Sequence, residues 1–207
     1  MIEEIMKNLD LMFPDARCEL IYHNSYELLV AIMLSAQTTD KAVNKVTPAL
    51  FLEFPSIEAL AQADYSSIEN CIRSLGLFRN KAKNLKLMAH DVIAHYNGEI
   101  PKDFNSLTSL PGVGRKTANV FLAEFYQIPR VPVDTHVERV TKRLGIVPME
   151  ASVFETEKKI MEVFPMDKWI KLHHQFIFLG RYVCKALNPN CCLCRLANIC
   201  QKGDKNV

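Results

Sequence analysis

Hydrophobic residues recur at intervals of three or four along most of the chain, which is the spacing of one buried helix face. The first such stripe ends before Pro14 and consists of Ile2, Ile5, Met6, Leu9 and Phe13. Asn24 and Glu27 have capping-box spacing and open a second helical pattern that continues to Ala36. No stretch alternates apolar and polar residues in the manner of a strand. We therefore predict an all-α protein with roughly ten helices.

Three further patterns predict helices in the middle and at the end of the chain. One helix should run from about Asp40 toward Phe54, although Pro48 removes a backbone donor and should kink or split it. A second should run from Arg79 to His95, with a basic cluster that includes Arg79 and Lys81 at its start. Taken alone, this cluster is more often a solvated face than a DNA contact. A last long helix is expected from about Asp167 to Leu187.

Composition narrows the class of protein. The 207 residues are 49% hydrophobic and 23% charged, which is typical of a folded globular protein. The net charge of +2 is only mildly basic, so any nucleic-acid surface must come from local clustering. The N-terminus lacks a basic leader with an apolar core, and the longest apolar run, Leu28–Leu34, is too short to span a bilayer. We therefore expect a soluble, intracellular, cytoplasmic monomer without membrane attachment.

The segment Leu110–Ala118 reads LPGVGRKTA and predicts a tight turn that leads into a helix. Gly112 and Gly114 can adopt positive φ and can approach a partner closely, because neither has a Cβ atom. The first turn of the following helix offers backbone N–H groups and a positive dipole end to a phosphate oxygen. Because Pro101–Ser109 reads as a short helix, the unit resembles the helix-hairpin-helix of DNA-repair proteins. The hairpin alone is equally compatible with an ordinary turn.

Four cysteines fall close together near the C-terminus, with the spacing Cys-x6-Cys-x2-Cys-x5-Cys. They are Cys184, Cys191, Cys194 and Cys200. Thiols this close indicate a soft metal centre, and both zinc and a [4Fe-4S] cluster accept four cysteines. Zinc ribbons usually show two Cys-x2-Cys pairs, whereas this segment has one, so the spacing favours the cluster. The charge of a cluster would be compensated locally by Arg181, Lys185, Arg195 and Lys202.

These motifs together resemble the endonuclease III family of DNA glycosylases and abasic-site lyases. The resemblance rests on the hairpin with Lys116, on the segment Val133–His136 with Asp134, and on the cysteine spacing. It extends through Leu34–Asp40 and Gly76–Ala82, so it covers nearly the whole chain. It implies base excision repair of double-stranded DNA that contains damaged pyrimidines or abasic sites.

The resemblance also implies two helical lobes with a DNA-binding cleft between them. Residues 21–131 would form a six-helix barrel, with the helix-hairpin-helix at about 101–126. Residues 1–20 and 132–207 would form the lobe that carries the iron-sulfur cluster. Lys116 and Asp134 would flank the cleft.

Lys116 and Asp134 are the implied catalytic pair. Lys116 would attack the sugar C1′ as a neutral amine and form a Schiff base that permits β-elimination; burial and the positive helix end would favour the neutral amine. Thr135 and Glu138 have capping-box spacing, which places Asp134 at a helix entrance. There it would stabilise positive charge on the sugar and handle protons. The simpler alternatives are a phosphate contact for Lys116 and a structural carboxylate for Asp134.

Other residues would contact DNA or the cluster. A flipped base must leave the stack at a cost of about a few kcal/mol. Gln37 would enter the vacated space and Leu77 would wedge the opposite strand, unless they are a helix-end polar residue and a core leucine. The remaining implied DNA contacts are Gly112, Val113, Gly114, Arg115, Arg79 and Lys81. The implied cluster ligands are Cys184, Cys191, Cys194 and Cys200.

Three alternatives remain open at this point. An adenine-mismatch glycosylase shares the hairpin and the cluster but lacks a lysine at the position of Lys116. A pyrimidine-dimer-specific lyase would keep that lysine. A non-catalytic, cluster-bearing DNA-binding module would leave an abasic strand whole.

Overall fold

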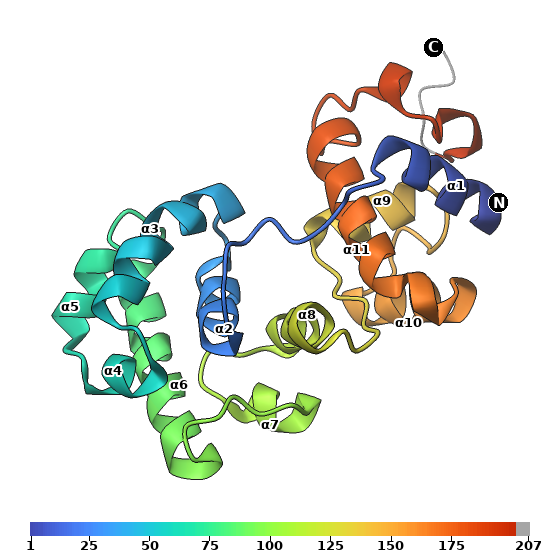
Figure 1. The fold of residues 1–207 in the computed structure, drawn as a ribbon. Coiled ribbons are helices and arrows are strands. Elements are labelled where there is room, and N and C mark those ends of the chain that lie inside the picture. Colours follow the sequence, from blue (N-terminus) through green and yellow to red (C-terminus); the bar gives the residue numbers. More distant parts are fainter. Residues whose placement is uncertain (202–207) are drawn as a thin grey trace. The chain divides into compact units, whose positions relative to one another are not determined.

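The structure, a computed structural model, describes residues 1–201 and contains eleven α-helices and no strand in that range (Figure 1). The predicted all-α class is confirmed. No helix in the described range is long and apolar enough to cross a membrane. Contacts divide the chain into two compact units, which are described separately. We call Glu19–Ile128 the hairpin unit, and Met1–Cys18 with the chain from Pro129 onward the cysteine unit.

The hairpin unit is built around α2, which is apolar on all sides. Every residue of α2 from Leu28 to Leu34 is buried, which is the pattern of a helix enclosed by others. The neighbours that pack against it are α3, α6 and α8. The helices of this unit are α2 (Ser25–Leu34), α3 (Asp40–Glu53), α4 (Ile57–Gln62), α5 (Tyr65–Cys71), α6 (Phe78–Tyr96), α7 (Phe104–Ser109) and α8 (Arg115–Tyr126).

α3 continues through Pro48 as one helix, so the chain is not split there. The Thr39 side chain caps its start by accepting a hydrogen bond from the Ala42 N–H at 3.2 Å. Val43, Val46 and Leu50 are buried on one face on both sides of the proline. Burial of this face compensates for the missing backbone donor.

The cysteine unit has its own hydrophobic core, formed by both ends of the chain. Ile5 and Leu9 of α1 are fully buried in the same cluster as Phe176 of α11. The Asp10 carboxylate of α1 accepts hydrogen bonds from Lys171 at 2.6 Å and from Gln175 at 2.8 Å. The helices of this unit are α1 (Ile2–Met12), α9 (Thr135–Arg143), α10 (Val153–Val163) and α11 (Trp169–Phe178).

The long final helix predicted from about Asp167 to Leu187 is confirmed over most of its length, but it ends at Val183, before the first cysteine. A 3-10 turn over Met166–Lys168 precedes α11, and the helix widens into a π turn over Leu179–Val183. The Cys184 N–H closes this turn on the Leu179 carbonyl at 2.7 Å. α9 lies so close to the turn that a Cβ at Gly180 would sit 2.8 Å from the Cβ of His136.

Candidate active site and cysteine centre

The hairpin Leu110–Gly114 joins α7 to α8 and approaches α6. Gly112 has a φ of +77°, and a Cβ on it would lie 2.8 Å from the Cβ of Asn84, so only glycine fits. Gly114 has a φ of −85° and is the N-cap of α8, so the expected positive φ is wrong at this position. A Cβ on Gly114 would meet nothing within 4 Å. The start of α8 therefore faces open space that a ligand can enter.

Arg115 and Lys116 are the first two residues of α8, and both side chains are exposed. The Arg115 guanidinium lies 5.2 Å from the ring centroid of Phe104 on α7. Backbone N–H groups in the first turn of a helix lack intrahelical partners and point toward an approaching anion. The expected burial of Lys116 is therefore not found, because its side chain is exposed.

Gln37 and Leu77 share an unusual backbone conformation. Gln37 follows α2 with a φ of 54°, and Leu77 precedes α6 with a φ of 58°. Each non-glycine residue in this left-handed region stores about 1–3 kcal/mol of strain, and such residues cluster at functional sites. The Leu77 side chain is 58% exposed, so it is not a core leucine. More than half of this leucine is accessible to a partner.

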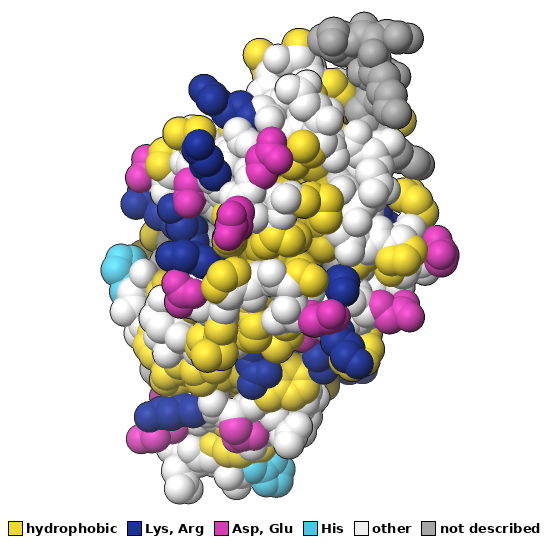
Figure 2. Space-filling model, turned by 90° about the vertical axis from the view of Figure 1, so that its right-hand side faces the viewer, with side chains coloured by type: hydrophobic (Ala, Val, Ile, Leu, Met, Phe, Trp, Pro, Cys, Tyr) yellow, Lys and Arg dark blue, Asp and Glu magenta, His cyan; other side chains and the backbone are white. Residues whose placement is uncertain are grey.

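The two basic residues of the α6 cluster differ in exposure. Arg79 is exposed and lies 4.0 Å from Glu69, Nε to Oε2. Lys81 is 8% exposed and donates from Nζ to Oγ1 of Thr38 at 2.5 Å. Burial lowers the pKa of Lys81. On the face drawn in Figure 2, basic side chains are interspersed with acidic ones, in keeping with the small net charge.

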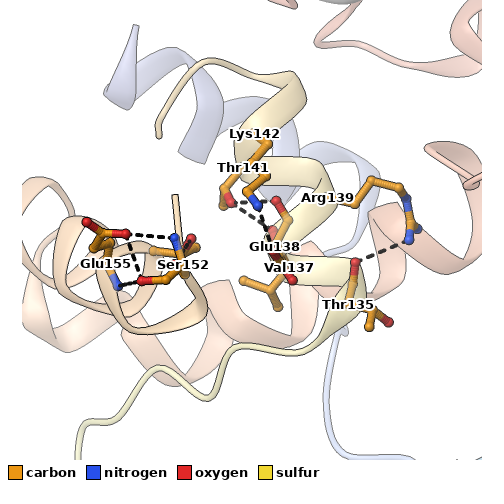
Figure 3. Close-up of polar contacts among 9 residues, drawn as sticks. Thr135, Val137, Glu138, Arg139, Thr141, Lys142, Ser152 and Glu155 are labelled. Carbon is orange, nitrogen blue, oxygen red and sulfur yellow. Dashed lines mark hydrogen bonds and ion pairs between the residues drawn. The ribbon is translucent and has the colours of Figure 1, made fainter. Parts of the chain in front are cut away.

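Asp134 is the N-cap of α9. Its Oδ1 accepts hydrogen bonds from the backbone N–H groups of His136 at 2.8 Å and Val137 at 2.9 Å. The expected capping box of Thr135 and Glu138 is wrong, because Asp134 itself caps the helix. Glu138 instead accepts from Lys142 at 2.6 Å (Figure 3). Asp134 therefore has a demonstrable structural role in addition to its expected chemical one.

The four predicted cysteines are brought together around one cavity of about 140 Å³ in the cysteine unit. No His, Asp or Glu lines this cavity, so the four cysteines are its soft donors. Burial raises the pKa of the Cys194 thiol, and the sulfurs of Cys184, Cys200 and Cys191 raise it further. Within residues 1–201, no three His, Cys, Asp or Glu side chains are already gathered as a single metal ion would need. Four soft donors around a cavity fit a cluster of several metal atoms.

Arg143, at the end of α9, contacts both the first and the last of these cysteines. Its Nη1 lies 3.3 Å from the Cys184 sulfur and donates to the Lys185 carbonyl at 2.7 Å. The Arg143 carbonyl accepts from the Cys200 thiol at 3.2 Å. Arg143 was not among the residues predicted to compensate the charge of a cluster. Of the predicted residues, Lys202 lies outside the described part of the chain.

Arg139, one helical turn earlier, reaches the same loop. Its Nε donates to the Cys184 carbonyl at 3.1 Å and its Nη2 to the Gly180 carbonyl at 2.8 Å. A further bond, from Nη1 to the Thr135 carbonyl at 3.2 Å, is drawn in Figure 3. The sequence did contain a signal for these contacts. Arg139 and Arg143 are four residues apart on the helix that follows Asp134, so both lie on one face of it.

The chain is similar to DNA-repair proteins over most of its length. Residues 30–166 match the family model described as HhH-GPD superfamily base excision DNA repair protein. The chain is 46% identical over 204 residues to endonuclease III of Bacillus subtilis (strain 168), covering 99% of this chain and 93% of that protein. This chain therefore belongs to the endonuclease III family.

Two solved structures show the same fold in complexes with DNA. One is a trapped endonuclease III-DNA covalent intermediate in an estranged-adenine complex, with a TM-score of 0.94 and 46% identity, covering 99% of this chain and 98% of that one. The other is a non-covalent endonuclease III-DNA complex, with a TM-score of 0.95 and 46% identity, covering 99% of this chain and 95% of that one.

Proposed function

We propose that this chain excises oxidised pyrimidines from duplex DNA through a lysine Schiff base and then cleaves the strand by β-elimination. Its class, a base-excision-repair DNA glycosylase with abasic-site lyase activity, follows from its family. The observation that carries the proposal is the position of Lys116, in the first turn of α8 beside an uncapped helix start that faces open space. A phosphate bound at that start would bring the sugar-phosphate backbone to the amine.

The Lys116 amine is the nucleophile in this proposal. Its lone pair forms a bond to C1′ while the glycosidic bond breaks, and the departing base takes a proton. The C1′–O4′ bond then breaks, O4′ takes up a proton, and the opened sugar is held to the lysine as an iminium. The iminium makes the C2′ proton acidic, so that its removal expels the 3′ phosphate. Water then releases the lysine. The covalent intermediate described for the related endonuclease III-DNA structure supports this type of linkage.

Asp134 supplies negative charge in this proposal. A carboxylate stabilises the positive charge that develops on the sugar as the base leaves, and it can take up or return protons in the lyase steps. The hydrogen bonds that Oδ1 accepts from two backbone N–H groups hold the carboxylate in a fixed orientation. A fixed charge is worth more in a transition state than one that must reorient.

Gln37 and Leu77 act on the duplex rather than on the bond that breaks. The base must be extruded before C1′ is accessible, and damage that weakens stacking makes extrusion easier. An exposed leucine can wedge between bases, and an amide can hydrogen-bond to the unpaired partner base. Selection of oxidised, non-planar pyrimidines follows from the lower cost of unstacking them.

A [4Fe-4S] cluster held by Cys184, Cys191, Cys194 and Cys200 is part of this proposal. Bound there, it would link the four cysteines and fix the loop between them, without taking part in bond cleavage. The four cysteines that line one cavity and the contact from the Arg143 side chain to the Cys184 sulfur support this assignment. An absorption band near about 400 nm would identify iron-sulfur, whereas zinc would leave the protein colourless.

Borohydride trapping on an abasic or thymine-glycol duplex tests the nucleophile. Wild-type protein should form a covalent complex, and Lys116→Gln should lose it while still binding the duplex. Lys158→Gln, at an exposed position of α10, is the matched control and should trap normally. If Lys116→Gln traps as well as the wild type, the nucleophile is misassigned.

Substrate comparison tests the class of lesion. Thymine glycol should be released much faster than uracil or mismatched adenine from otherwise identical duplexes, and a pyrimidine photodimer should not be opened. Strand cleavage at an abasic site should accompany release; a non-catalytic binding module would leave the strand whole. Because the substrate is chromosomal DNA, we place the protein in the cytoplasm, with the nucleoid.

A further inference from the structure

Lys81 joins the two turns that carry Gln37 and Leu77. Its side chain is 8% exposed although it ends in an ammonium group, and its Nζ donates to Oγ1 of Thr38 at 2.5 Å. Its backbone N–H donates to the Leu77 carbonyl at 3.0 Å. One residue therefore contacts the neighbour of Gln37 with its side chain and contacts Leu77 with its main chain.

Thr38 extends this connection across Gln37. Its hydroxyl donates to the Ala36 carbonyl at 3.3 Å, and its backbone N–H donates to the Ser35 carbonyl at 3.0 Å. A hydroxyl can accept one hydrogen bond while it donates another. The two residues that flank Gln37 are thus held by a single oxygen that is itself fixed by Lys81. A non-glycine residue stays in the left-handed region only where its surroundings determine its conformation in this way.

We propose that Lys81 is a positioning residue that fixes the Gln37 turn against Leu77 and so sets the spacing of the two side chains that probe the duplex. It does not act as a phosphate contact, because little of the residue is exposed and its Nζ donates to Thr38. A buried ammonium must be hydrogen-bonded to be tolerated, which makes this link specific. The proposal rests on the proposed function, since it assumes that Gln37 and Leu77 enter the duplex.

Lys81→Met tests this role against Lys83→Met, a matched change at an exposed lysine of the same helix. Removal of one phosphate contact makes the plot of log affinity against log salt shallower by about 0.9 for duplex DNA. Lys81→Met should keep the wild-type slope but slow single-turnover release of thymine glycol about tenfold, the factor expected from one lost hydrogen bond to a charged group. A 2-aminopurine beside the lesion should report weaker unstacking. Lys83→Met should keep the wild-type rate and unstacking signal.

Thr38→Val removes the same hydrogen bond at its acceptor and leaves the sequence of α6 unchanged. This variant can therefore test the proposal if Lys81→Met does not fold. Both single variants should slow release, and the double variant should be no slower than the worse of them, because they remove one interaction. Melting temperatures identify any general loss of structure.

A shallower salt dependence of DNA affinity in Lys81→Met would overturn the proposal, and so would a slowing in the double variant equal to the product of the two single effects. So would wild-type rates and unstacking in a folded Lys81→Met. These outcomes are distinct from failure of the proposed function, which would appear as absence of borohydride trapping by the wild-type protein.

Discussion

Asp134 has two separable properties, a capping oxygen and a negative charge, and two substitutions divide them. Asp134→Asn keeps an oxygen that can accept from the His136 and Val137 N–H groups but loses the charge. Asp134→Ala loses both. Asn and Asp are nearly equal as N-caps, whereas replacement by Ala costs about 0.5–2 kcal/mol.

The geometry places the alanine variant near the upper end of that range, because two short bonds of 2.8 and 2.9 Å are lost together. We expect a loss of about 2 kcal/mol for Asp134→Ala, and about 0.5 kcal/mol for Asp134→Asn from the lost interaction with the helix dipole. For a chain of this size, 1 kcal/mol shifts the melting temperature by about 2–4 °C. Asp134→Ala should therefore melt about 4–8 °C lower, and Asp134→Asn about 1–2 °C lower.

Catalysis should divide differently from stability. Both variants should slow single-turnover base release by about 100-fold or more, the usual contribution of a catalytic acid or base. Ser152→Ala is the matched control, since Ser152 caps α10 in the same unit through a capping box with Glu155 (Figure 3). It should lower the melting temperature without slowing release. Full activity in Asp134→Asn would refute the catalytic role, and equal melting of the two Asp134 variants would refute the capping role.

Three further outcomes are expected. Arg143→Ala should lower the iron content of the purified protein and speed the loss of its visible absorption on exposure to a chelator, because the loop loses the guanidinium contacts to the Cys184 sulfur and to the Lys185 and Ala186 carbonyls. Gly112→Ala should destabilise the protein by more than about 1 kcal/mol in thermal unfolding, because its φ is positive and the site is crowded, whereas Gly114→Ala should fold normally but bind DNA more weakly. The hydrogen bond from Lys171 holds the pKa of Asp10 below its ordinary value of 3.8. The Asp10 carboxylate therefore stabilises the fold above about pH 4, and this contribution is lost as the pH falls further. Asp10→Asn should make the melting temperature less dependent on pH between about pH 5 and 3.

The features that sequence predicted well are governed by local rules. The helical class follows from apolar spacing, and the hairpin follows from a Gly-x-Gly placed between two short helical patterns. The cysteine grouping was predictable because all four thiols lie in one short segment, and any compact fold of that segment brings them near each other.

The features that sequence missed depend on contacts between distant segments. The side chain of Arg143 reaches Cys184 across 41 positions, and Lys81 reaches Thr38 across 43. The last helix ends at Val183 after a π turn, which the apolar spacing of α11 does not indicate. The sequence correctly placed Asp134 at the entrance of α9, but it indicated Thr135 as the cap, whereas the cap is Asp134 itself. Local spacing fixes a helix end only to within one or two residues.

The open space in front of Gly114 has a consequence for how the protein behaves along a chromosome. In the proposed function, main-chain amides at this helix start bind a phosphate. Such amides carry no titrating group and no base-reading side chain, so this contact would depend neither on pH nor on the base sequence around a lesion. The same contact also resists change by mutation, since replacing a neighbouring side chain leaves the amides in place. Discrimination between damaged and intact DNA must then be made elsewhere, by the residues that disturb the stack.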